Sequence, residues 1–152
     1  MSRITREQML IEMAYIASKR GTCGRLAVGA VLARDSRPIS LGYVGAPPGE
    51  PHCEEAKCDL SKACTRTRHA EHNVLRFALE HKIRTVGADL FVTDSPCLSC
   101  AEEIIDAGIA RVFFDREYRL TDGLELLLSA PIEIHRILAN GMIRRITSAP
   151  RS

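Results

Sequence analysis

Residues 89–108, DLFVTDSPCLSCAEEIIDAG, have the pattern of a strand that runs directly into a helix. The first six residues form a short apolar run typical of a buried strand, and the later apolar residues recur at helical spacing as far as Gly108. Pro96 suits the first turn of that helix, so Cys97 and Cys100 are predicted to lie at a helix N-terminus.

The spacing of Cys97 and Cys100 points both sulfurs to the same side of a helix, where they could hold one metal ion. Unpaired N–H groups at a helix N-terminus favour the thiolate form that binds zinc. A redox pair or two buried thiols would fit this fragment equally well. The fragment alone therefore leaves the choice open.

A second motif, His69-Ala70-Glu71, opens segment 69–82, whose periodicity predicts another helix. His69 and Glu71 are separated by about 200° of helical rotation, so they cannot both be ligands of one ion. Taken alone, His69 fits a helix cap and Glu71 a residue that complements the helix dipole. Joined to the two cysteines, they form what a catalytic zinc requires: three ligands, an open position and a free carboxylate.

The rest of the chain surrounds these two motifs with further strands and helices. Thr5 and Gln8 fit a capping box, and Met9, Met13, Ile16 and Ala17 recur at helical spacing up to Gly21. We expect a helix over 5–21, strands over 26–33 and 39–44 joined by a turn at 34–38, a strand over 111–114, a helix over 121–129 and a strand over 132–137. This order predicts an α/β fold, a three-layer α/β/α sandwich with a mixed five-stranded sheet. The tail after Ala139 fits either a docking helix or a frayed end.

The composition is that of a single globular domain, expected over residues 1–152: 45% of the residues are hydrophobic and 26% are charged. A net charge of +2, from 21 basic and 19 acidic residues, argues against a nucleic-acid-binding surface. No run of 18 apolar residues is present, so we expect no membrane partner and a cytoplasmic location. Six cysteines in that compartment favour metal ligands or buried thiols over disulfides.

The combination of H-x-E with P-C-x-x-C, 28 residues from His69 to Cys97, resembles the signature of the cytidine and deoxycytidylate deaminase superfamily. The similarity is greatest to its deoxycytidylate deaminases and covers about residues 5–137. It is carried, in the same order, by CGRLAVGAV (23–31), GYVG (42–45), CTRTRHAEHN (64–73) and FVTDSPC (91–97). The resemblance implies the cytidine deaminase fold and zinc-dependent hydrolysis of dCMP, or a modified dCMP, to dUMP and ammonia, which would supply thymidylate synthesis.

The resemblance also implies roles for individual residues. His69, Cys97 and Cys100 would hold the catalytic zinc, and Glu71 would move protons between water, the cytosine ring and the departing ammonia. Ala30 would pack near the base, the backbone around Ser95 would contact its edge, and Tyr118 would lie close to the pocket, with Val44 at the position expected to face the sugar or an effector. For the 5′-phosphate we choose Arg25, with Arg68 in reserve.

A second, structural zinc is implied by relatives that carry an insert before the catalytic histidine. The turn-rich segment at about 45–67 has the place of such an insert. Its ligands would be Cys23, Cys53, Cys58 and Cys64. An alternative set replaces Cys53 by His52 or leaves one cysteine as a free thiol.

Two residues depart from the family pattern. Val44 stands where the family usually has an asparagine, which is expected to contact the sugar or an effector, and His72 stands where an apolar residue is common. Either the pocket accepts a different or modified cytosine nucleotide, or the response to the effectors dCTP and dTTP differs. The resemblance further implies a homo-oligomer, with a hexamer favoured.

Two other classes of function stay open at this point. The protein could deaminate another substrate, such as tRNA adenosine, cytidine, dCTP or a pyrimidine-pathway intermediate. It could also be a non-catalytic, zinc-stabilised binding protein of the competence type. An intact Glu71 counts against the second alternative, because a structural zinc has no use for a carboxylate that is not a ligand.

Overall fold

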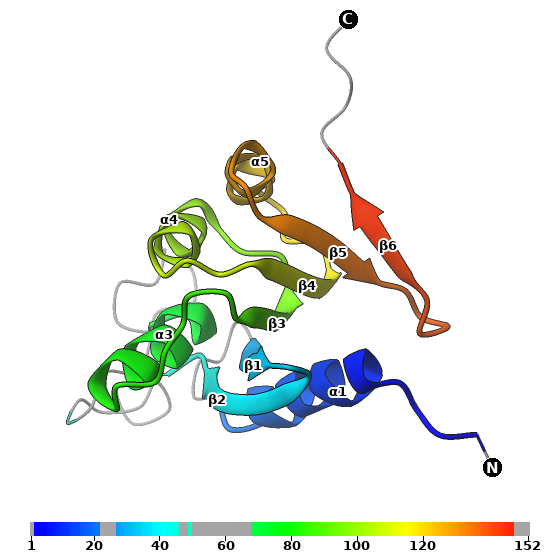
Figure 1. Cartoon of the computed structure of the whole chain (residues 1–152), viewed down its shortest axis with the longest axis horizontal. Helices are drawn as coiled ribbons and strands as arrows, with labels where there is room; N and C mark the ends of the chain where they lie inside the picture. Colours follow the sequence, from blue (N-terminus) through cyan, green and yellow to red (C-terminus); the bar gives the residue numbers. More distant parts are fainter. Residues whose placement is uncertain (1, 22–26, 46–48, 50–67, 148–152) are drawn as a thin grey trace, which may run out of the picture.

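The computed structural model describes residues 2–21, 27–45, 49 and 68–147. Within them, one six-stranded sheet has the order β2-β1-β3-β4-β5-β6 (Figure 1). None of the described helices has the length and apolar character needed to cross a bilayer. The elements are α1 (Arg6–Ser18), β1 (Gly29–Arg34), β2 (Arg37–Tyr43), α3 (Ala70–Glu80), β3 (Asp89–Asp94), α4 (Leu98–Asp106), β4 (Arg111–Arg116), α5 (Asp122–Ser129), β5 (Glu133–Ile137) and β6 (Ile143–Ile146).

The sheet has helices on both faces, as the three-layer prediction requires. Alternate residues of a strand point to opposite faces, and the two core clusters follow this rule. Leu90 and Val92 of β3 belong to the larger core with residues of α3, α4 and α5, whereas Phe91 belongs to the smaller core with residues of α1. Figure 1 shows α1 on one side of the sheet and the other three helices on the opposite side. The predicted α/β/α sandwich is confirmed.

The pairing of the strands makes the sheet mixed. β3, β4 and β5 are parallel neighbours, whereas β1 pairs with β2 and β3 in antiparallel fashion. β6 adds a sixth strand, antiparallel to β5, so the predicted count of five was wrong. This strand lies in the ambiguous tail. Its sequence is short and polar, IRRI, and three of its four residues are exposed, so it carries no apolar pattern.

The turn between β1 and β2 is shorter than the turn at 34–38 that the sequence predicts. Asp35 and Ser36 alone make the turn, with φ angles of 53° and 62°, which is the left-handed conformation of a two-residue hairpin loop. Pro38 therefore lies inside β2 rather than in the turn. A proline is tolerated there because β2 is an edge strand and the register shifts opposite it, between Leu32 and Ala33.

The predicted capping box is present at the start of α1. The side of the helix that is buried differs from the predicted one. The Thr5 hydroxyl accepts from the Gln8 N–H at 3.0 Å, and the Gln8 side chain accepts from the Thr5 N–H at 2.8 Å. The helix ends at Ser18, before the expected Gly21. Of the four apolar residues singled out, Ala17 is buried, whereas Ile16 is 66% exposed. The buried side is formed by Leu10, Ile11, Ala14, Ala17 and Ser18.

Candidate metal and catalytic site

The N-terminus of α3 is attached to the end of β2 by backbone and side-chain bonds. His69 is the N-cap residue of α3. The residue before it, Arg68, exchanges two backbone hydrogen bonds with Gly45, at 2.8 and 3.2 Å. The Asn73 amide donates to the Tyr43 carbonyl at 2.8 Å, one turn into the helix. These bonds fix where the helix begins and therefore where His69 lies.

The N-terminus of α4 holds the two cysteines. Cys97 is the N-cap residue and Cys100 is the third residue of the helix. Pro96 was predicted in the first turn and instead precedes the cap, because Cys97 has extended backbone angles of −75° and 173°. Helix α5 packs closely against this start: a Cβ on Gly123 would lie 2.2 Å from the Pro96 carbonyl oxygen and 2.6 Å from that of Cys97.

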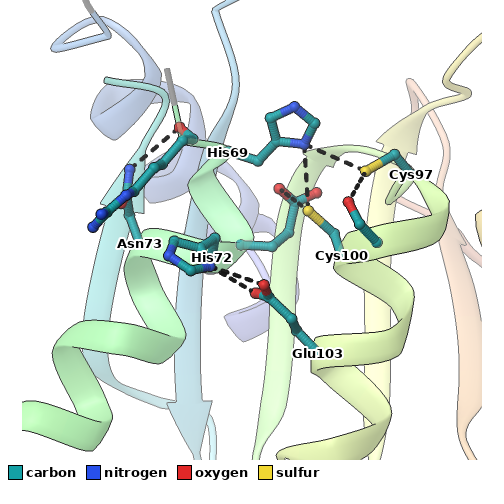
Figure 2. Close-up of polar contacts among 9 residues, drawn as sticks. His69, His72, Asn73, Cys97, Cys100 and Glu103 are labelled. Atoms are coloured by element: carbon teal, nitrogen blue, oxygen red, sulfur yellow. Dashed lines mark hydrogen bonds and ion pairs between the residues drawn. The ribbon is translucent and has the colours of Figure 1, made fainter. Parts of the chain in front are cut away.

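Both N-cap side chains point away from their own helices and towards each other. Neither His69 nor Cys97 makes a side-chain hydrogen bond that caps its helix. Instead, the His69 Nδ1 lies 3.4 Å from the Cys97 Sγ and 3.3 Å from the Cys100 Sγ (Figure 2). Two N-termini thus bring three metal-binding atoms together at the carboxyl end of β3.

The three atoms have the arrangement that a tetrahedral metal ion needs. All of them lie within 4.8 Å of one another. Zinc bonds to nitrogen and sulfur at tetrahedral angles would place nitrogen and sulfur about 3.5 Å apart, which agrees with the two observed distances. One imidazole and two thiols are also a donor set that zinc prefers. The residues therefore fit zinc with three protein ligands.

The electrostatics of the two thiols favour one thiolate. The pKa of Cys97 is lowered to about 3, chiefly because the Cys100 thiol hydrogen-bonds to it and also through contacts with His69 and Ser99. The same hydrogen bond and burial raise the pKa of Cys100. Without a metal, the pair therefore shares one negative charge between two sulfurs.

Glu71 lies beside the cluster without belonging to it. The residue is 4% exposed, and its Oε2 lies 3.7 Å from the Cys100 Sγ. Burial raises the pKa of Glu71 to about 7, since a charged carboxylate loses its hydration there. The site therefore contains a buried carboxyl group next to three candidate ligands.

A cavity opens onto this cluster. It is lined by His69, Glu71 and Cys97 together with Val28, Val44, Asp94, Ser95 and Tyr118. The Ser95 N–H donates to the Arg116 carbonyl at 2.8 Å, and the Ser95 hydroxyl accepts from the Tyr118 N–H at 2.7 Å. The wall that contains Ser95 and Tyr118 is therefore held together by its own hydrogen bonds.

The predicted substrate residues divide into three groups. Val44, Ser95 and Tyr118 line the cavity, whereas Ala30 is fully buried in the larger core and is not among the lining residues. Arg25 lies outside the described residues, as do the predicted structural-zinc ligands Cys23, Cys53, Cys58 and Cys64 and nearly all of the predicted insert.

Sequence reasoning missed Asp94 and Val28 as lining residues, and Arg116, which pairs with Asp94 at 2.6 Å. A signal for Asp94 was present. It is an ionisable residue at the carboxyl end of a predicted strand, next to the cysteine motif, which is where α/β folds place their sites.

A His/Cys/Cys cluster with a buried glutamate beside it, held between two helix N-termini over a mixed sheet, defines a zinc-dependent deaminase. The chain belongs to the cytidine and deoxycytidylate deaminase family. The model of the cytidine and deoxycytidylate deaminase zinc-binding region matches residues 4–116. The resemblance seen in the sequence is therefore confirmed.

Known relatives cover most of the chain. ComE operon protein 2 of Bacillus subtilis is 34% identical over 145 residues, which are 94% of this chain and 77% of that protein. Deoxycytidylate deaminase of Mycobacterium phage D29 is 34% identical over an alignment 129 residues long, and the match covers 77% of this chain and 99% of that protein. Among solved structures, dCMP deaminase from cyanophage S-TIM5 in complex with dCMP and dUMP has a TM-score of 0.81 and 28% identity, and the match covers 90% of this chain and 99% of the phage chain.

Proposed function

We propose that this protein is a deoxycytidylate deaminase, which hydrolyses dCMP, or a dCMP with a modified base, to dUMP and ammonia. The observation that carries the proposal is the position of Glu71, buried in the same cavity as His69 and Cys97 without being one of the three candidate ligands. The nucleotide substrate is supported by the phage relative and by the solved structure that contains dCMP and dUMP.

The proposed reaction needs a metal ion to activate water and one side chain to transfer protons. A zinc ion held by His69, Cys97 and Cys100 would supply a water molecule of lowered pKa as the nucleophile for C4 of cytosine. Glu71 accepts a proton from that water, donates one to N3 of the ring and later passes one to the departing amino group. A C4–O bond replaces the C4–N bond, and of the two water protons one ends on N3 and one leaves with ammonia.

The substrate would occupy the cavity beside Glu71. Val44, Ser95 and Tyr118 are the proposed contacts to the base and sugar, with Ala30 packed near the base. Arg25 is the proposed contact to the 5′-phosphate, and Arg68, adjacent to His69, is the second candidate. The Val44 side chain is a hydrocarbon and can form no hydrogen bond in the cavity. We therefore expect selectivity to depend on the sugar and on any substituent of the base.

We also propose that residues 1–152 form one deaminase domain whose insert, at about 45–67, binds a second zinc. Its ligands would be Cys23, Cys53, Cys58 and Cys64. The proposal rests on the spacing of these cysteines in the sequence and on the general tendency of metal ions to order loops that lack a core. A cytoplasmic location, a homo-oligomer with a hexamer favoured, and dCTP and dTTP as effectors complete it.

The deciding experiment is a substrate panel with ammonia release as the readout. Purified, zinc-loaded protein is given dCMP, 5-substituted dCMP, dCTP, cytidine and cytosine, each with and without dCTP or dTTP as effector. We expect turnover to be greatest with dCMP or a 5-substituted dCMP. Turnover restricted to cytidine or dCTP would assign the alternative deaminase, and no turnover on any compound would overturn the proposal in favour of a tRNA adenosine deaminase or a non-catalytic binding protein.

A further inference from the structure

His72 and Glu103 form a second connection between α3 and α4, directly below the candidate metal site. His72 follows His69 by three residues on α3, and Glu103 follows Cys100 by three residues on α4. Residues three apart are neighbours on one side of a helix, so each of the two lies one turn beyond a candidate ligand. Figure 2 shows the imidazole and the carboxylate meeting in the gap between the helices.

The contact is well formed. The His72 Nδ1 lies 2.9 and 3.0 Å from the two carboxylate oxygens of Glu103. Because a carboxylate only accepts hydrogen bonds, the Nδ1–H of His72 is the donor. The two side chains are 34% and 42% exposed. A pair as exposed as this contributes little to the stability of the whole fold, so its effect must be sought in local geometry.

Among the described residues, this is the one side-chain hydrogen bond between α3 and α4 that does not involve the candidate site itself. In the described part of the chain, the remaining side-chain hydrogen bonds between the two segments are those of His69 and Glu71 with the cysteines themselves. The two helices contact each other and share the larger core, but their other supports differ: α3 packs on β1 and β2, whereas α4 packs on α5. Apolar packing of this kind tolerates small sliding movements, whereas a directed hydrogen bond between the helices does not.

That distance determines the geometry of the site. His69 and Glu71 belong to α3, and Cys97 and Cys100 belong to α4. A shift of one helix against the other would change every distance between nitrogen and sulfur and between carboxylate and thiol. Ligand sets and catalytic groups lose affinity and rate when they are displaced by as little as about 1 Å.

We propose that His72 and Glu103 are positioning residues, whose hydrogen bond holds α3 and α4 at the separation at which His69 and Glu71 meet Cys97 and Cys100. The proposal rests on the proposed function only in that the three candidate ligands bind a metal. His72 is not among the residues that line the cavity, and its hydrogen-bond partner is Glu103, so its effect passes through the relative placement of the two helices. The charge of Glu103 also acts on Cys100, which makes the His72 variants the cleaner test.

The test compares variants that remove the bond with variants that keep it. His72→Leu and Glu103→Leu remove it from either side. His72→Asn keeps a donor amide close to the position of Nδ1, and Glu103→Gln keeps an acceptor oxygen. Arg76→Leu is the matched control, because Arg76 forms an ion pair with Glu80 at 2.8 Å and similar exposure, but within α3 alone.

Two measurements report on the metal site independently of turnover. Cobalt-substituted protein gives an absorption spectrum that depends on the ligand geometry, and subtracting the spectrum of a Cys97→Ser, Cys100→Ser double variant isolates this site. Chelator competition gives the metal dissociation constant. Kinetic constants with dCMP and thermal unfolding of each variant complete the set.

We expect each leucine variant to alter the cobalt spectrum and to weaken metal binding by about tenfold or more. The double leucine variant should be no worse than either single one, because both remove the same bond. His72→Asn should restore the spectrum, and Arg76→Leu should leave it unchanged. If His72→Leu does not fold, Glu103→Leu carries the same test from the other helix.

An unchanged cobalt spectrum and metal affinity in the leucine variants would overturn the proposal, as would effects equal to those of Arg76→Leu. Failure of the proposed function would give a different result from failure of this positioning role. In that case no substrate on the panel is turned over by the wild-type protein, while the leucine variants still alter the spectrum.

Discussion

The Arg116 Nε lies 2.6 Å from the Asp94 Oδ1, and this pairing of β4 with β3 is repeated at the other end of the same strands by Arg111 and Asp89. In both cases the arginine stands opposite the aspartate in the parallel register. Both carboxylates are nearly buried, with 12% and 10% of their side-chain surface exposed. Of these four residues, Asp94 alone lines the cavity.

This repetition supplies a matched pair of variants. Arg116→Leu leaves the buried Asp94 carboxylate without its cation, and Arg111→Leu does the same to Asp89. Each is expected to lower the free energy of unfolding by about 1 to 3 kcal/mol, as measured by urea denaturation. Only Arg116→Leu should also raise KM for the nucleotide, because it releases a wall of the cavity. Equal changes of KM in both variants would contradict this assignment.

The role of Glu71 is tested by Glu71→Gln. The amide has nearly the same volume, but it cannot carry a proton between water and substrate. We expect kcat to fall by about 100-fold to 10,000-fold, with zinc content and thermal unfolding unchanged. Retained activity would place the proton shuttle elsewhere.

Zinc analysis of the whole protein distinguishes the two proposed metal sites. We expect two zinc ions per chain in the wild type and one in each of Cys58→Ser and Cys97→Ser. The Cys97 variant should lose activity, whereas the Cys58 variant should keep the cobalt spectrum of the catalytic site. A single zinc in the wild type would remove the structural site.

The pH dependence of stability is expected to involve His135, on β5. Its ring stacks on Phe113 at 4.8 Å, and its Nε2 is buried without a hydrogen-bond partner among the described residues. Burial lowers its pKa, and the nearby charges of Arg111 and Arg145 act in the same direction against Glu133. The unfolded chain therefore binds a proton more readily than the folded one.

The sign of the effect follows from this difference. The stability contributed by neutral His135 is complete above its unfolded pKa of about 6.5 and is lost as the pH falls through that value towards the folded pKa. His135→Phe should keep the stack and show a smaller loss of unfolding free energy between pH 8 and pH 5. Identical losses in the two proteins would show that other groups cause it.

Most of the fold follows from local patterns that the sequence displays openly. The capping box at Thr5, the apolar run of β3 and the helical spacing after Cys97 each predict an element that exists. The errors lie where tertiary contacts decide. Ile16 has the spacing of a buried residue but faces solvent, because α1 turns the side that contains Leu10 and Ala14 to the sheet. β6 is specified by its pairing with β5 rather than by an apolar pattern.

The candidate site was predictable to a similar degree and for a similar reason. His69, Cys97 and Cys100 were found because a metal requires particular atoms at particular spacings, which a sequence records directly. Val28 and Arg116 were not found, because a cavity wall and an ion-pair partner are defined by what lies across the sheet. Asp94 is an intermediate case. Its position at the end of a strand is readable from the sequence, but its ion-pair partner Arg116 lies on another strand.

The close contact of α5 with the start of α4 restricts which residues evolution or a mutagenesis library can place at position 123. A methyl group there would collide with backbone oxygens of Pro96 and Cys97, which cannot turn aside as a side chain could. In a library randomised at this codon and selected for metal retention, glycine should be recovered almost alone, while the exposed neighbour Asp122 varies freely. A residue that bears no ligand and no charge is thus among the least replaceable in the chain.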